Sequence, residues 1–182
     1  MKVITFLLFL LFSAAALAQP KVYFSPSLQC EKRLLKLIDN AKESIDIAVY
    51  SINNTNLVEA LKRAHKRGVK IRILTDRTQA ANKSSKVKDL HNEKLRVRVH
   101  SKFRIEHNKF AVFDGKKAST GSYNWTNPAT HKNSENCVFF TDSPEVVKKY
   151  QRRFNYLWQV NTRKASEAWF KEHKQPPVKE PH

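Results

Sequence analysis

Acidic residues are scarce in this chain of 182 residues. Asp and Glu number 16 against 34 Lys and Arg, which gives a formal net charge of +18 at pH 7. Such an excess predicts attraction to polyanions, with nucleic acid as the first candidate and an anionic membrane surface as the second. The alternative is that the basic surface only maintains solubility.

Cysteine is also rare, since Cys30 and Cys137 are the only two. Neither belongs to a C-x-x-C pair, and two cysteines with scattered histidines make a poor zinc site. We therefore expect no metal and no cofactor. In an oxidising compartment the even count permits one disulfide, and two separate buried thiols are the alternative.

The one apolar run at the amino terminus, Val3 to Phe12, is short for a membrane-spanning helix. Residues 1–18 begin with Lys2, continue with this run and end in Ala-Leu-Ala, which is typical of a cleaved signal peptide. Cleavage would remove one lysine and leave 18 − 1 = +17. We expect a periplasmic or secreted protein. An uncleaved membrane anchor is the alternative, and only then would a membrane be a partner.

Short strand and helix patterns alternate through the first half of the chain. Expected strands are 21–24, 44–50, 69–74 and 95–99, and expected helices are 31–41, 57–67 and a short one around 86–91, which a polar loop from residue 77 is expected to precede. Thr55 or Asn56 is expected to cap the second helix and Gly68 to end it. This rhythm predicts the α/β class, with a mixed, mostly parallel sheet flanked by helices. The length suits one domain.

The second half is expected to hold a loop at 126–134, a last strand at 137–140 and a helix at 144–160. Beyond Asn161 the composition turns polar and basic. We therefore place the catalytic domain at 19–160 and expect a loosely ordered tail at 161–182.

Residues 107–124, HNKFAVFDGKKASTGSYN, hold polar side chains that packing does not require. On a strand, His107 and Lys109 share one face, and Phe110 lies on the other. Asp114 and Gly115 signal a tight turn, after which a second strand leads back to Ser122 and Asn124.

This set suits attack on a phosphodiester. The His107 imidazole can act as nucleophile or general acid, while Lys109 and Asn124 hold the phosphate oxygens. We expect Glu135, eleven residues beyond Asn124, to return on a neighbouring strand and accept a hydrogen bond from the far nitrogen of His107.

The pattern His107-x-Lys109-x4-Asp114-x6-Gly121-Ser122-x-Asn124 resembles the HKD motif of the phospholipase D superfamily, at every one of its positions. The single motif is similar to that of the small secreted bacterial Nuc-type endonucleases. The resemblance extends over about residues 21–158 and implies a phospholipase D-like α/β sandwich. It also implies roles for seven residues. The catalytic set would be His107, Lys109, Asn124 and Glu135, Ser122 would support phosphate binding, and Asp114 would be structural, as would Gly121.

Further basic residues precede the motif. Arg96 and Arg98 alternate with apolar residues on the expected strand 95–99 and form either a solvated face or a phosphate-binding stripe that continues through Lys102 and Arg104. Trp125 either stacks on a base or supports its loop.

One H-x-K set supplies one imidazole, whereas displacement at phosphorus needs a nucleophile and a separate acid. A symmetric homodimer with two His107 rings at one site solves this, through a phosphohistidine. The sequence therefore predicts a metal-independent nuclease of low sequence specificity. The alternatives are a phospholipase D or cardiolipin-type lipid hydrolase and a non-catalytic basic DNA-binding protein.

Overall fold

The computed structural model describes residues 19–173, so the predicted signal peptide and residues 174–182 lie outside the described part. The strands are β1 (Lys21–Ser25), β2 (Ser44–Val49), β3 (Lys70–Thr75), β4 (Arg96–Val99), β5 (Lys109–Phe113), β6 (Lys117–Gly121) and β7 (Glu135–Phe140). The helices are α1 (Gln29–Asn40), α2 (Thr55–Lys66), α3 (Arg77–Ala81), α4 (Val87–Asn92), α5 (Asn127–His131), α6 (Pro144–Val160) and α7 (Arg163–Glu172).

The strands form one mixed sheet in the order β1-β7-β6-β5-β2-β3-β4. The parallel pairings are β2 with β3 and β3 with β4, and the other four pairings are antiparallel. The predicted α/β class and mixed sheet flanked by helices are confirmed. The parallel part is smaller than expected, because the chain after β4 turns back and adds four antiparallel pairings.

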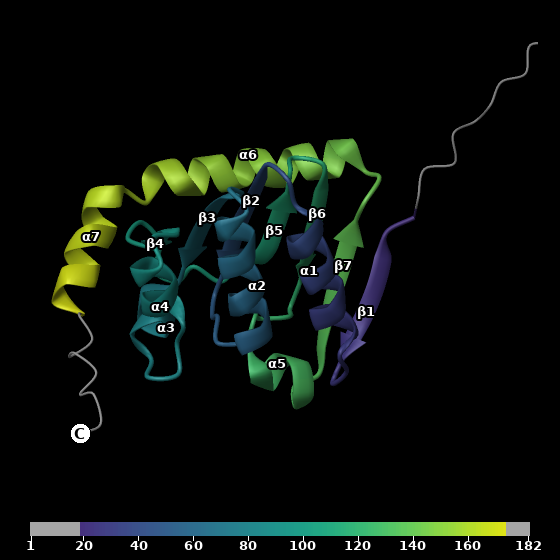
Figure 1. Ribbon diagram of the computed structural model, residues 1–182, viewed down its shortest axis with the longest axis horizontal. Helices are drawn as coiled ribbons and strands as arrows, with labels where there is room; N and C mark the ends of the chain where they lie inside the picture. The colour runs from purple at the N-terminus through teal and green to yellow at the C-terminus, as the bar shows by residue number, and fades with distance from the viewer. Residues whose placement is uncertain (1–18, 174–182) are drawn as a thin grey trace, which may run out of the picture.

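Helices cover both faces of the sheet (Figure 1). The amphipathic helices α1 and α2 bury Leu34, Ile38, Leu57 and Leu61 against one face, in a large apolar cluster that includes Ile45 of β2. Burial of such side chains is the main contribution to stability, at about 1.5–3 kcal/mol for each.

Helix α6 lies across the opposite face (Figure 1). Its apolar side chains, Phe154 and Leu157 among them, form a second cluster with Phe110 and Val112 of β5. Polar contacts fix its position as well, since Gln151 Nε2 donates to Asp46 Oδ2 at 2.7 Å. Within residues 19–173, no helix is both long and apolar enough to cross a membrane.

Three local predictions were wrong. Asn54, and not Thr55 or Asn56, caps α2, because its side chain accepts from Leu57 N at 3.0 Å. The expected loop at 126–134 contains the short helix α5, capped by Thr126. The polar segment before α4 contains α3, whose cap Asp76 accepts from two backbone N–H groups.

The expectation of a loosely ordered tail is also wrong for residues 163–172, which form α7. Thr162 caps this helix, and Trp169 and Phe170 are each only 7% exposed. Figure 1 shows α7 following α6 beside the β4 edge of the sheet. The polar composition of this segment did not indicate a helix, because only a few apolar residues are needed to pack a helix against an existing core.

Cys30 of α1 and Cys137 of β7 form a disulfide, with Cα atoms 5.9 Å apart. The alternative of two separate thiols is therefore excluded. The bond links residues 107 positions apart in the sequence and fastens α1 to the strand that begins at Glu135.

Asp114 lies in the turn between β5 and β6, where it and Gly115 both have positive φ, of 53° and 62°. Its carboxylate accepts from the backbone N–H groups of Lys42, Glu43 and Ser44 at 2.8–3.1 Å. Burial raises the pKa of Asp114, but these hydrogen bonds outweigh that effect and hold the pKa below its ordinary value. The carboxylate thus connects the hairpin to the start of β2.

Replacing Asp114 tests this connection. We expect Asp114→Ala to lower the free energy of unfolding by about 2 kcal/mol at neutral pH, because three N–H groups lose their acceptor. A carboxylate whose pKa is lower in the folded than in the unfolded protein stabilises the fold at pH values above its unfolded pKa. This stabilisation is lost as the pH falls through the folded pKa. The gap between wild type and variant, measured by urea denaturation, should therefore narrow in acid. The control is Asp39→Ala, which breaks an exposed ion pair with Arg63 and should lower the free energy of unfolding by less than about 1 kcal/mol. An equal gap at pH 7 and in acid would contradict the prediction.

Candidate active site

The candidate catalytic residues gather where β5 begins and β6 ends. Ala111 lies opposite Ser119 in the hairpin, and the same register continued outward places Gly121 opposite Lys109. Ser122 therefore returns to the end of the sheet that carries His107 and Lys109, as predicted. On the other side, β5 pairs with β2, which places Lys109 opposite Val49 and next to Tyr50.

Tyr50 holds the H-x-K segment in place. Its backbone N–H donates to Asn108 O at 2.8 Å, and its ring meets the edge of the His107 ring with centroids 4.7 Å apart. Gln79 Nε2 in turn donates to the Tyr50 hydroxyl at 2.9 Å. The His107 side chain stays exposed, so the imidazole is both oriented and open to a substrate.

Lys109 lies between two carboxylates and an aromatic ring. Its Nζ donates to His107 O at 2.7 Å and lies 5.1 Å from the centroid of Tyr50. Burial lowers the pKa of Lys109, and the charges of Glu135 and Glu106 offset part of this effect. The ammonium group is thus partly desolvated, which strengthens its attraction for a phosphate oxygen.

Glu135 binds Ser122, which differs from the expected contact with His107. Ser122 Oγ donates to Glu135 Oε2 at 2.5 Å, and Asn133 Nδ2 donates to Glu135 Oε1 at 3.1 Å. Within residues 19–173, the hydrogen bonds include none between Glu135 and His107. The expectation was wrong because Glu135 and Ser122 are brought together by the pairing of β7 with β6, while His107 lies before β5.

Gly121 is required by the close approach of β7. Its φ is 140°, and a Cβ at this position would lie 2.2 Å from the carbonyl oxygen of Asn136. The backbone N–H of Ser122 donates to that same oxygen at 3.1 Å. Without a side chain at 121, the chain can therefore turn and present Ser122 to Glu135.

A buried polar network supports the segment from Tyr123 onward. The Tyr123 hydroxyl and Thr130 Oγ1 are 2.5 Å apart, Asn54 Nδ2 donates to Thr130 Oγ1, and Glu31 accepts from Asn54 at 2.8 Å. Burial raises the pKa of Tyr123 to about 12, although the bond to Thr130 lowers it somewhat. This network fixes the backbone on both sides of Asn124.

Asn124 itself has a buried amide oxygen, and within the described residues it is the buried side-chain N or O atom without a hydrogen-bond partner. Leaving such an atom unpaired costs about 1–3 kcal/mol. Buried polar atoms are almost always paired, so an exception calls for a functional account, such as a donor that arrives with a ligand.

The prediction that Trp125 stacks on a base is wrong. The side chain is only 2% exposed, and its backbone exchanges hydrogen bonds with Ser51, Asn53 and Asn54. Trp125 therefore supports the loop after β2, which was the alternative interpretation.

Arg96 and Arg98 do not continue toward His107. Arg98 lies opposite Leu74, whose side chain packs under α6, whereas Lys109 lies opposite Val49 on the other face of the sheet. Arg98 donates to the carbonyl oxygens of Trp158 and Asn161. Lys102 and Arg104 are exposed in the loop that leads from β4 to His107, and the backbone N–H of Lys102 donates to Asn161 Oδ1 at 3.1 Å, at the end of α6.

Several supporting residues were missed from the sequence. Tyr50, Glu31 and Asn54 come from segments far from the motif, and nothing in their local sequence distinguishes them from ordinary residues of a helix, strand or loop. The one available signal was the polar side chain of Glu31 among the apolar positions of α1, which the structure buries to 4% exposure. Over residues 19–173, no group of three or more His, Cys, Asp or Glu has the arrangement of a metal site.

Known proteins share this fold. Residues 34–158 match the family described as "Cardiolipin synthase, PLD-like domain". The chain belongs to the phospholipase D superfamily. It resembles the crystal structure of Nuc from Salmonella typhimurium, a phospholipase D family member, with a TM-score of 0.74 and 30% identity, over 79% of this chain and 97% of Nuc.

Curated relatives carry lipid-related names. A mitochondrial cardiolipin hydrolase of Xenopus tropicalis is 39% identical over 127 residues, which is 70% of this chain and 60% of the relative. A phospholipase D of Rickettsia conorii is 38% identical over 127 residues, 70% of this chain and 63% of the relative. The chain thus spans about 60% of the length of these relatives.

The electrostatics of the site can be tested on Lys109. We expect Glu135→Gln to lower the pKa of Lys109 further, because the variant removes a negative charge that raises it. The measurement is an NMR titration of the lysine 13Cε signals, with Lys109 identified by Lys109→Gln. Glu145→Gln, an exposed change at the start of α6, is the control and should leave the Lys109 titration unmoved. A rise in the pKa after Glu135→Gln would refute this arrangement of charges.

Proposed function

We propose that the chain is an exported, metal-independent phosphodiesterase that cleaves nucleic acid with low sequence specificity. The observation that carries the proposal is the assembly of His107, Lys109, Ser122 and Asn124 at one end of the sheet, beside Glu135. The fold match over 97% of Nuc supports a nuclease within the superfamily.

In the first step, a ring nitrogen of His107 attacks phosphorus and forms a phosphorus–nitrogen bond, while the bond to the leaving oxygen breaks. Lys109 and Asn124 bind the non-bridging oxygens and stabilise their added negative charge. Ser122, held by Glu135 at 2.5 Å, supports the same phosphate. Glu135 therefore acts by positioning Ser122 and by its charge near Lys109.

The leaving oxygen needs a proton, and one chain supplies one H-x-K set. In the proposed homodimer, the imidazole of a second copy protonates the leaving oxygen, then takes a proton from the water that attacks phosphorus and breaks the bond to nitrogen. Because one ring acts neutral and the other protonated, we expect a bell-shaped pH profile.

Nucleic acid is favoured as substrate by charge. The excess of 34 Lys and Arg over 16 Asp and Glu attracts a phosphate backbone, and backbone recognition gives little sequence specificity. Lys102 and Arg104, which are exposed in the loop that leads to His107, add positive charge for phosphates of the same strand outside the proposed cleavage site.

A lipid phosphodiester is the second candidate, and one observation favours it beyond the names of relatives. The loop before His107 exposes Phe103 and Ile105, at 36% and 49%, which alternate along the chain with the exposed basic residues Lys102 and Arg104. Exposed apolar side chains together with basic ones favour binding at an anionic membrane surface.

The nucleophile is tested with His107→Ala. We expect plasmid DNA cleavage in EDTA by the protein from residue 19 onward, and a loss of at least about a thousandfold in the variant, because no other group replaces the attacking nitrogen. His131→Ala, an exposed histidine of α5 near the site, is the control and should cleave normally.

Two results would count against the proposal. Activity that disappears in EDTA and returns with magnesium would contradict a metal-independent reaction. A protein that sediments as a monomer at concentrations where it cleaves DNA would leave the reaction without its acid. DNA binding with no cleavage by any variant would instead support the non-catalytic alternative.

Substitutions in the loop before His107 distinguish between nucleic acid and phospholipid as the substrate. We expect Phe103→Ser/Ile105→Ser to leave DNA cleavage nearly unchanged, because neither side chain carries charge to the phosphate, and the unmutated protein to leave phospholipids intact. The measurement compares plasmid cleavage with phospholipid turnover in cardiolipin-containing vesicles. Turnover of vesicles by the wild type that falls in this variant would establish the lipid substrate.

A further inference from the structure

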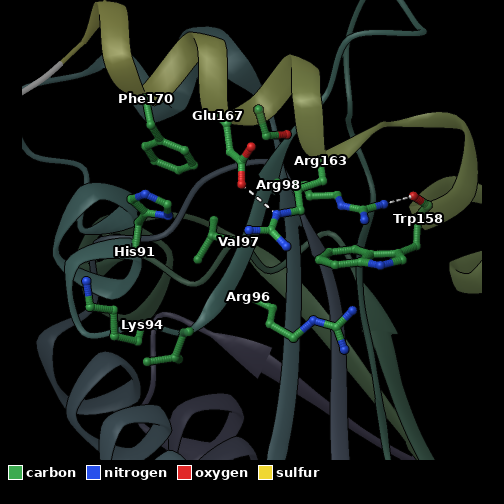
Figure 2. Close-up of a pocket in the computed structure, with 11 residues that line it drawn as sticks. His91, Lys94, Arg96, Val97, Arg98, Trp158, Arg163, Glu167 and Phe170 are labelled. Atoms are coloured by element: carbon green, nitrogen blue, oxygen red, sulfur yellow. Dashed lines mark hydrogen bonds and ion pairs between the residues drawn. The ribbon is translucent and has the colours of Figure 1, made fainter.

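A second basic region lies at the edge of the sheet away from the HKD residues. Helix α7 and strand β4 enclose a cavity of about 420 Å³, with His91 of α4 and Trp158 of α6 in its walls. Figure 2 shows His91 and Phe170 at one end and Trp158 at the other, with the side chains of Arg96, Arg98 and Arg163 near the tryptophan.

An adjoining cavity extends this space along α4 and α7. It is about 440 Å³ and shares His91, Glu167 and Phe170 with the first. We call the two cavities together the α4–α7 groove. An elongated groove suits an extended ligand better than a single small ion.

Positive charge in the groove greatly exceeds negative charge. The formal cations that line it are Lys88, Lys94, Arg96, Arg98, Arg163 and Lys171. The carboxylate among the lining residues is Glu167, which pairs with Arg163 Nε at 2.5 Å. Among the ion pairs of the part of the chain that the structure describes, Arg163 is the one member of this set that has a carboxylate partner.

Arg98 and Arg96 differ in the contacts of their guanidinium groups. Arg98 is fixed by the carbonyl oxygens of Trp158 and Asn161 and lies 4.1 Å over the Trp158 ring. Arg96 is exposed, and its contact within the described residues is with the same ring, at 5.7 Å. Among the hydrogen bonds of residues 19–173, none uses the guanidinium donors of Arg96, so these donors are open to a ligand.

Burial lowers the pKa of Arg98, and the charges of Arg96, Arg72 and Arg163 lower it further. The groove thus holds like charges close together without matching acids. A polyanion bound there would relieve this repulsion and release the counterions that now screen it.

We propose that the α4–α7 groove is a second binding site for nucleic acid, where the phosphates of a strand contact Arg96, Lys171 and their neighbours outside the cleavage site. The inference rests on the proposed function for its substrate class. A lipid surface fits less well, because the aromatic residues here, Trp158 and Phe170, are each only 7% exposed and have little surface to insert. Helix α7 lies beyond residues 34–158, so the groove is built partly outside the matched family domain.

Binding can be measured without cleavage in a His107→Ala background. We expect Arg96→Gln/Lys171→Gln to weaken the binding of a fluorescent DNA oligonucleotide and to lower the slope of log Kd against log salt concentration by about 1 for each phosphate that is no longer bound. Lys36→Gln/Arg152→Gln is the matched control, since it removes the same charge at exposed residues of α1 and α6 that line neither cavity. Equal slopes in the two double variants would overturn the inference.

A second measurement locates the ligand without altering the groove. The indole N–H signal of Trp158, identified by Trp158→Phe, should shift when the oligonucleotide is added to the His107→Ala protein. If inorganic phosphate shifts this signal but the oligonucleotide does not, the groove takes a small anion and the inference is wrong. Loss of DNA cleavage in His107→Ala tests the proposed function, whereas a lower salt slope in Arg96→Gln/Lys171→Gln tests the α4–α7 groove. Failure of one proposal can therefore be distinguished from failure of the other.

Discussion

The antiparallel pairing of β5 with β2 sets the geometry on which the rest of the site depends. Lys109 lies opposite Val49, so the amino end of β5 meets the carboxyl end of β2. His107 then reaches Tyr50, and the hairpin partner β6 brings Ser122 to the same place. A shift by one residue would turn Lys109 to the opposite face, beneath α6. The Asp114 carboxylate, bound to three N–H groups ahead of β2, holds this register from the far end.

The two basic regions lie at different places on the same sheet, one where β5 begins and β6 ends and the other at the β4 edge, and they differ in character. At the candidate active site, one lysine is partly desolvated and the charges of Glu135 and Glu106 act on it, which limits the excess of positive charge there. In the α4–α7 groove, cations outnumber acids, and within residues 19–173 Arg163 is the one lining cation with an ion pair. Such a division suits a protein that orients one phosphate accurately and holds the rest of a polyanion loosely.

The motif and the main elements could be predicted from the sequence because each depends on local spacing. The period of His107 and Lys109, the turn at Asp114 and the helix at 144–160 are all readable from neighbours in the chain. Contacts across the sheet were not readable. Glu135 was expected to meet His107, yet strand pairing brings it to Ser122. Arg96 and Arg98 were close to the motif in sequence, but β4 and β5 are separated by β3 and β2. Helix α7 was missed because its few apolar residues gain their stability from the core they cover.

The two edges of the sheet differ in a way that bears on self-association. Helix α7 lies beside β4, whereas β1 forms the opposite edge with Val22 and Phe24 exposed at 49% and 67%. An uncovered edge strand presents unpaired N–H and C=O groups, and exposed apolar side chains make it a template for another strand. Partial unfolding or crowding should therefore join molecules through β1, so that fibre-like aggregates, if they form, grow from that side of the protein.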